Sequence, residues 1–496
     1  MACTLASRIL GLVKARALTS AFGAGAVADV INVAYFFPNS LRKLFAEGAA
    51  DAAIIPGFSR LDDKESRSKL LSIITSFQIA LFAIIISLTF IFRYQLFDLM
   101  SNFTGESLTL GSNLLPLFMI FLAILSIATV FWSLLKCDRK FLLASLAPLF
   151  CSVAIIFFLL YFTPVLGPFS MAYGCIVGAI LQLIYCVILV IRSHYFFTPN
   201  FHFSSPIFQK TLHAWLVIIL SSVITIISQQ YSQYLASGLE IGSATAYANA
   251  IIFFSAPYGI IFNGIVAVAF TELSDAHAHQ DTVRFKNQLS YALTGLISWL
   301  VPCAIVMGFL RTEIIATVLQ TGKFTFQYTL LTATVLFQLM IGLVIVALKA
   351  CLYRTMLSRG EAHKTLPLTI GEAIVDIILS TILVHTYHNV ASLPLAGNIS
   401  AGIFLIIYAI ILKKDIDFTA LISYMGKIVR VNIPVTLLLL FYKSFHLSWY
   451  HSGSSLRNLG ILCFAGCILG LIVLASYQIA GIPLLTFLKK TKKIQK

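Results

Sequence analysis

The chain has 496 residues, of which 59% are hydrophobic and only 11% are charged, and its mean hydropathy is +0.94. Soluble domains carry about 25% charged residues, so this composition excludes a soluble protein. The formal net charge of +15 indicates basic loops that are attracted to anionic lipid headgroups. We therefore expect membrane lipids as partners, and no nucleic acid.

Fourteen apolar runs, each about 20 residues long, follow one another with only short polar breaks. Unpaired backbone groups are costly in lipid, so we expect these runs to be α-helices. The pattern predicts an all-α polytopic membrane protein with about 14 transmembrane helices. The runs begin near residues 4, 26, 70, 110, 141, 167, 212, 243, 288, 328, 366, 391, 428 and 458.

The distribution of lysine and arginine predicts the orientation of the chain. An even number of spans places both termini on one side of the membrane, and basic loops face the cytoplasm. If the basic tail that ends at Lys496 is cytoplasmic, only five basic residues fall on the outer side: Arg93, Arg311, Lys323, Lys443 and Arg457. We therefore predict that both termini are cytoplasmic.

The segment SHYFFTPNFHFSSPIFQK, residues 193–210, separates six predicted helices from six more. Two bundles of equal helix number are typical of transporters built on repeats, with the substrate site between them. We expect an N-lobe at 1–200, a C-lobe at 201–412 and two further helices at 413–496.

The motifs favour a transporter over an enzyme. The sequence contains no GxxxxGK[ST] motif, so transport must draw on an ion gradient, the membrane potential or the substrate gradient. A membrane glycosyltransferase is the alternative from another class, and it needs catalytic carboxylates in an outer loop. The outer loops near 93–107 and 442–456 offer only Asp98 and Glu106. We expect no catalytic residues, no metal site and no cofactor.

Charged residues are concentrated in the first two predicted spans. A charge at the bilayer centre costs roughly 2.5 to 3.5 kcal/mol, so such groups normally face a wet cavity or one another. At about 100° per residue, Arg8 and Arg16 lie about 80° apart and Lys14 points elsewhere. We expect Arg8 and Lys14 in a cavity, with Arg16 reaching the interface; the alternative is that all three reach headgroups.

Pro38 lies within the second span, in FFPNSLRKLFAEG, and removes a backbone donor. We expect a helix break there, with Asn39 or Ser40 capping a new helical segment. Arg42 and Lys43 would then occupy a first turn and form an anion site with the freed N–H groups. The alternative is an i,i+4 pair between Lys43 and Glu47. The same span carries Asp29 nearer its start.

Two carboxylates, Glu372 and Asp376, lie four residues apart on one face of the eleventh span. They repel each other unless a cation or proton lies between them, which makes them candidates for a Na⁺ or H⁺ coupling site. The alternative is charge pairing with Lys349 of the tenth span. Either arrangement could gain oxygen ligands from Gln229, Gln230 and Gln233.

The first 60 residues carry three dense motifs, S-R-x-L-G-x-x-R, F-G-A-G…A-D and P-N-x-x-R-x-x-F-A-E-G-A, which are nearly intact from Ser7 to Ala49. With these motifs the segment resembles the opening of the MurJ/MviN family of lipid II flippases. Looser agreement continues at TGKF, residues 321–324, and KTLP, residues 364–367. The resemblance implies a member of the multidrug/oligosaccharidyl-lipid/polysaccharide exporter superfamily in the bacterial inner membrane. We expect the protein to be a monomer.

This resemblance implies that the substrate is lipid II, an undecaprenyl-pyrophosphate-linked precursor of peptidoglycan, flipped outward by alternating access. It implies that the last two helices form a groove for the lipid tail. Glu372 and Asp376 lie where some members have an asparagine and an aspartate in a sodium site, so this chain is similar there but not identical. It also implies a set of substrate-binding residues: Arg8, Lys14, Asp29, Asn39, Arg42, Lys43 and Glu47.

The sequence departs from the family pattern at three places. Lys14 replaces the usual arginine, Ala15 stands where an acidic residue usually follows, and Asn249 and Ala250 lie where an arginine is common. We therefore expect a less positive second lobe. The alternatives within transporters are a flippase for another polyprenyl-linked saccharide and a drug/sodium antiporter of the same superfamily.

Overall fold

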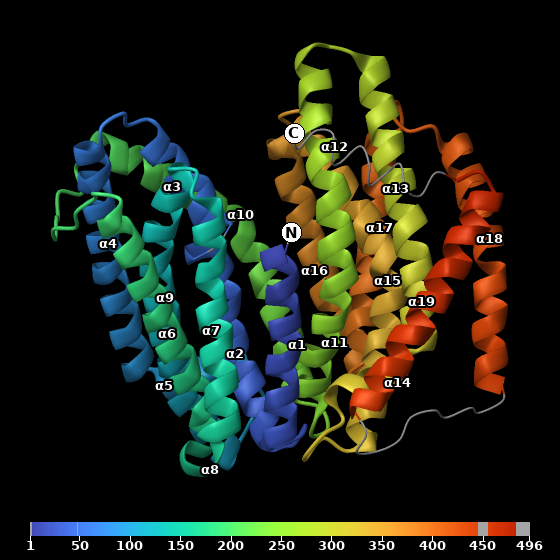
Figure 1. Cartoon of the computed structure of the whole chain (residues 1–496), viewed down its shortest axis with the longest axis horizontal. Helices are drawn as coiled ribbons and strands as arrows, with labels where there is room; N and C mark the ends of the chain where they lie inside the picture. The colour runs from blue at the N-terminus through green and yellow to red at the C-terminus, as the bar shows by residue number, and fades with distance from the viewer. Residues whose placement is uncertain (1, 47, 445–454, 483–496) are drawn as a thin grey trace. The chain divides into compact units, whose positions relative to one another are not determined.

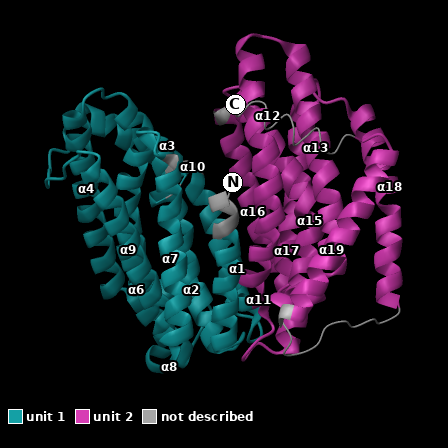
Figure 2. Cartoon of the chain, viewed as in Figure 1, with its two compact units in different colours: residues 1–245 teal, residues 246–496 magenta. Residues whose placement is uncertain are grey.

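The protein is described by a computed structural model that covers residues 2–46, 48–444 and 455–482. Glu47 and the basic tail at 489–496 lie outside these residues. Every regular element in the described part is a helix (Figure 1). The chain divides into two compact units, residues 1–245 and 246–496 (Figure 2).

Unit 1 is a bundle organised around α6, which packs against α2, α4 and α9, while α7 packs against α1 and α9. Its core contains Phe58, Leu134 and Trp215, and the indole of Trp215 donates to the carbonyl of Leu44 at 2.8 Å. The elements are α1 (Ala2–Phe22), α2 (Ala26–Phe45), α3 (Ala49–Ser59), α4 (Lys64–Ile91), α5 (Arg93–Met100), α6 (Gly105–Cys137), α7 (Phe141–Tyr161), α8 (Thr163–Leu166), η1 (Gly167–Phe169), α9 (Ser170–Arg192) and α10 (Pro206–Ser237).

Unit 2 is a second helical bundle, in which α15 packs against α13 and α17, and α17 also packs against α16. The unit boundary falls inside the first turn of α11. The elements are α11 (Ser243–Pro257), η2 (Tyr258–Phe262), α12 (Asn263–Ala278), α13 (Thr282–Phe309), α14 (Arg311–Leu319), α15 (Phe326–Ser358), α16 (Ala362–Tyr387), α17 (Ser392–Ile411), α18 (Phe418–Ser444) and α19 (Ser455–Ile479).

Twelve helices of the described residues are long and apolar enough to cross a membrane. The prediction of an all-helical, multi-pass membrane protein is confirmed. Helices α1 and α2 are not among the twelve and carry the charged residues discussed above, so the count of fourteen spans stays a prediction. The grouping into lobes at 1–200, 201–412 and 413–496 also stays a prediction.

Loop carboxylates fix where individual helices begin. Asp63 accepts from the backbone N–H of Ser66 at 2.7 Å at the start of α4, and this hydrogen bond lowers the pKa of the Asp63 carboxyl. Asp281 does the same for α13, accepting from the N–H of Arg284 at 2.9 Å. These caps satisfy backbone donors that a helix leaves open at its N-terminus.

Candidate functional site

Helix α2 runs without a break from Ala26 to Phe45, with Pro38 inside it. The predicted helix N-terminus at Asn39 or Ser40 is therefore wrong. Membrane helices tolerate an internal proline because neighbouring groups compensate the missing backbone hydrogen bond. Arg42 and Lys43 consequently lie in the last turn of α2, where the negative end of the helix dipole favours cations.

A chain of polar contacts links α1 to the middle of α2. The ammonium of Lys14 lies 3.5 Å from the hydroxyl of Tyr35 and 4.8 Å from the centre of its ring. The Tyr35 hydroxyl in turn donates to Oδ1 of Asn39 at 3.0 Å. The structure thus brings two predicted site residues, Lys14 and Asn39, together through a tyrosine.

Tyr35 was not predicted as a site residue. Its ring is fixed by Phe118 and Phe121 of α6, at centroid distances of 5.4 and 6.3 Å. A signal was available in the sequence, because Tyr35 lies four residues before Asn39 and therefore on the same face of a helix. A tyrosine within a membrane span also needs a partner for its hydroxyl. With Tyr35 included, α2 carries a polar stripe that faces Lys14.

Asp29 begins this polar stripe and is almost fully buried, with 4% of its surface exposed. Its Oδ2 accepts from the N–H of Gly242 at 2.6 Å, and its Oδ1 accepts from the N–H of Thr245 at 2.7 Å. Asn32, one turn further along, donates to the hydroxyl of Thr245 at 3.1 Å. Both Asp29 oxygens therefore hold the turn into α11. Substrate contact by Asp29 stays a prediction.

Replacing Asp29 by asparagine is expected to destabilise the protein by about 1 to 3 kcal/mol, the cost of a buried donor left without its acceptor. An amide group has one oxygen, so either the Gly242 or the Thr245 N–H loses its partner. The measurement is thermal unfolding of the purified full chain. The matched control is Asp62→Asn, the same change at an exposed position of the same unit, and an unchanged melting temperature in Asp29→Asn would contradict this role.

The other predicted cations lie on the same two helices. Arg8 is half-buried on α1, six residues before Lys14, and Arg42 is half-buried at the end of α2. Lys43 is exposed, and Glu47 lies outside the described residues. The alternative pairing of Lys43 with Glu47 therefore stays a prediction.

In unit 2, Lys349 of α15 forms an ion pair with Glu372 of α16. Their side chains are 18% and 23% exposed, within two helices that are apolar enough to span a membrane. Of the two alternatives that the sequence left open, the structure forms the pairing with Lys349. The Na⁺ or H⁺ coupling site at Glu372 and Asp376 stays a prediction.

Helix α17 adds polar groups beside this ion pair. The hydroxyl of Ser400 donates to the carbonyl of Glu372 at 3.2 Å. The side chain of Asn398 packs directly on Gly342 and donates to the carbonyl of Gln338 at 2.6 Å. A Cβ atom at position 342 would lie only 1.6 Å from Asn398 Oδ1. Glycine is therefore required at position 342 for this close approach.

Gln230, named above as a possible oxygen ligand of the coupling site, lies in unit 1. Its side-chain amide donates to the carbonyl of Met100 at 3.4 Å.

Comparisons with known proteins agree with the motifs. The family model described as lipid II flippase MurJ matches residues 18–460. A probable lipid II flippase MurJ of Borreliella burgdorferi is 28% identical over 488 residues, which cover 97% of this chain and 96% of the relative.

Solved structures give the same fold. A lipid II flippase MurJ in an inward closed conformation superimposes with a TM-score of 0.78 at 22% identity, covering 98% of each chain. An inward-facing multidrug resistance MATE family transporter of the MOP superfamily gives 0.68 at 14% identity, covering 86% of this chain and 96% of its own. The family match extends over most of the sequence, and the chain belongs to the lipid II flippase MurJ family.

Proposed function

We propose that this protein flips lipid II, the undecaprenyl-pyrophosphate-linked peptidoglycan precursor, from the inner to the outer leaflet of the bacterial cytoplasmic membrane by alternating access. Support comes from the family match over residues 18–460. It also comes from a relative named probable lipid II flippase MurJ, whose similarity to this chain covers 96% of its length. The observation that carries the proposal in the structure is the chain Lys14–Tyr35–Asn39, which positions an ammonium between two helices in the charged opening of the sequence.

Different residues of this chain would make different contacts with a diphosphate group. Lys14 has three N–H donors, and its contact with Tyr35 orients the group while leaving donors for phosphate oxygens. Arg42 supplies a planar fork that can bind two phosphate oxygens at once. Arg8 adds positive charge six residues before Lys14. Asn39, held by Tyr35, adds an amide that can donate to a phosphate oxygen or a sugar hydroxyl.

The proposed orientation places both termini in the cytoplasm, and the proposed working form is a monomer. The excess of lysine and arginine in alternate loops supports this orientation. Fusion of a reporter that is active on one side of the membrane to either terminus tests it.

The proposed coupling ion is H⁺. The ion pair of Lys349 and Glu372 supports H⁺ over Na⁺, because Lys349 already supplies the positive charge that two neighbouring carboxylates require. A paired ammonium and carboxylate can exchange a proton and become neutral, which lowers the cost of their place in the membrane. Asp376, one turn away on the same helix, is the second carboxylate of this cluster.

Conditional depletion of the protein in its own host tests the function. We expect the lipid-linked precursor to accumulate in the inner leaflet, as measured by accessibility to an enzyme or reagent added outside the cells. Accumulation in the outer leaflet would contradict flipping. Analysis of the accumulated lipid by mass spectrometry separates the alternatives, because a different saccharide on the polyprenyl diphosphate would assign the protein to that lipid instead. The antiporter alternative is not favoured by the family match.

A further inference from the structure

An apolar groove of about 550 Å³ lies between α7 and α9 of unit 1. This volume is within the range of about 300 to 1,000 Å³ that is typical of ligand pockets. Its lining is hydrophobic throughout and includes Leu146, Phe150, Val153, Leu181 and Tyr185. Phe150, Val153 and Leu181 are 39 to 54% exposed, so the groove is open along its length. Its walls suit a hydrocarbon chain.

Glycines on α9 bring the two helices together beside the groove. A Cβ at Gly178 would lie 2.8 Å from the Cα of Cys151, and one at Gly174 would lie 2.9 Å from the Cβ of Phe158. Such small residues four apart allow membrane helices to approach closely. The larger side chains on either side of this contact then line the groove.

Tyr185 lies at one end of the groove. Its ring lines the groove and packs against Phe150 at 4.9 Å between centroids, while its hydroxyl donates to the carbonyl of Leu143 at 3.1 Å. Tyrosines in this arrangement mark the level where hydrocarbon meets headgroups. The hydroxyl thus points toward the start of α7.

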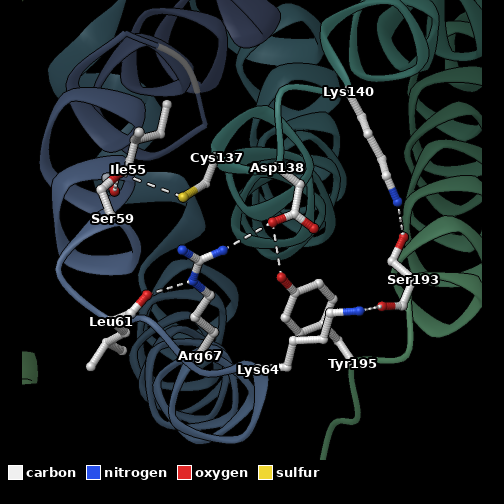
Figure 3. Close-up of polar contacts among 10 residues, drawn as sticks. All are labelled: Ile55, Ser59, Leu61, Lys64, Arg67, Cys137, Asp138, Lys140, Ser193 and Tyr195. Carbon is white, nitrogen blue, oxygen red and sulfur yellow. Dashed lines mark hydrogen bonds and ion pairs between the residues drawn. The ribbon is translucent and has the colours of Figure 1, made fainter.

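At that end, two lysines converge on one serine (Figure 3). Lys140, which precedes α7, donates to the hydroxyl of Ser193 at 2.5 Å, and Lys64 at the start of α4 donates to the carbonyl of Ser193 at 3.2 Å. Lys140 is six residues before Leu146 and Ser193 is eight residues after Tyr185, or roughly 9 and 12 Å along the helices. The lysines therefore lie just beyond the mouth of the groove.

The other charges of this cluster neutralise each other. Arg67 pairs with Asp138 at 3.1 Å, and Asp138 also accepts from the hydroxyl of Tyr195 at 2.9 Å. Burial raises the pKa of the Tyr195 phenol, which keeps it a donor. Within the described residues, no carboxylate lies within 4.0 Å of the ammonium groups of Lys64 or Lys140. In the described part of the chain, Lys64 and Lys140 therefore both contact Ser193 and have no carboxylate as a counter-ion.

We propose that the α7–α9 groove and the lysine pair Lys64 and Lys140 together form a binding site for an anionic phospholipid, with an acyl chain in the groove and the phosphate at the lysines. The apolar part suits any membrane lipid, and the charge selects an anionic headgroup. Lysines near a membrane surface attract the headgroups of anionic lipids. The site is separate from the residues proposed to bind lipid II.

Lipid titration of the purified full chain, followed by native mass spectrometry, tests the site. Phosphatidylglycerol is expected to bind on the order of tenfold tighter than phosphatidylcholine with the same acyl chains. The double variant Lys64→Gln/Lys140→Gln is expected to remove this preference and to leave phosphatidylcholine binding unchanged. Val153→Trp, which fills the groove, is expected to weaken the binding of both lipids.

Matched controls separate this site from general electrostatics and from loss of folding. Lys210→Gln removes an exposed charge of the same unit, and Leu160→Trp adds the same bulk to an exposed position of α7 outside the groove. Both should bind phosphatidylglycerol like the unchanged protein, and Lys64→Arg/Lys140→Arg should retain the preference. An equal loss in Lys210→Gln, or competition by millimolar inorganic phosphate as effective as by the lipid, would overturn the proposal.

Discussion

Arg42→Ala is expected to abolish growth when it is the only copy of the protein in a strain depleted of its lipid II flippase, whereas Arg16→Ala is expected to support growth. Arg42 is half-buried in the last turn of α2, beyond Asn39 on the polar stripe. Its loss removes the one bidentate phosphate donor that this helix offers, and hydrogen bonds to charged groups are worth about 1.5 to 3 kcal/mol each.

Arg16 is the matched control because it is also a half-buried arginine and lies in α1, the helix that precedes α2. Its position is two residues after Lys14, so it points about 160° away from the side of α1 that meets Tyr35. Arg42→Lys should give intermediate growth, since it keeps charge but loses the fork. Immunoblots must show equal amounts of each variant in the membrane. Equal growth of the two alanine strains would remove Arg42 from the site.

Lys349→Met is expected to destabilise the protein by about 3 to 5 kcal/mol, because it leaves Glu372 as an uncompensated charge in a poorly solvated place. Glu372→Gln should cost less than Lys349→Met, since lysine can lose its proton or reach the interface. The double variant Lys349→Met/Glu372→Gln should recover most of the lost stability. Thermal unfolding in detergent measures all three, and additive losses in the double variant would contradict direct pairing.

The same residues test the coupling ion. In proteoliposomes, replacing Na⁺ by choline is expected to leave flipping by the unchanged protein unaffected, while dissipating the pH gradient is expected to slow it. Lys349→Met/Glu372→Gln should flip slowly and show no response to the pH gradient. Strict dependence on Na⁺ would contradict the proposed coupling ion without affecting the assignment of the substrate.

The helices and the family were predictable from sequence because both rest on local patterns. Apolar runs predict where helices lie in a membrane, and the motif from Ser7 to Ala49 is dense enough to identify the family. The predicted helix break at Pro38 was wrong for a physical reason. Proline removes one backbone hydrogen bond, but the packing of a long helix against α6 and α10 outweighs that loss.

Contacts between helices distant in sequence were harder to predict. The sequence offered Lys349 or a bound cation as the partner of Glu372, and the ion pair with Lys349 depends on the placement of α15 against α16. The spacing of Tyr35 and Asn39 is visible in the sequence, but the contact of Tyr35 with Lys14, 21 residues earlier, is not. The α7–α9 groove depends on how closely Gly174 and Gly178 bring two backbones together, which no periodicity reveals.

The continuity of α2 has a mechanical consequence. Asp29 and Arg42 are 13 residues apart on one uninterrupted helix, which corresponds to roughly 20 Å of rigid rod. One end of the rod is fastened to the turn at Gly242, and the other carries a guanidinium group. Because the helix is continuous between these two residues, a displacement of that turn is transmitted along α2 to the guanidinium group.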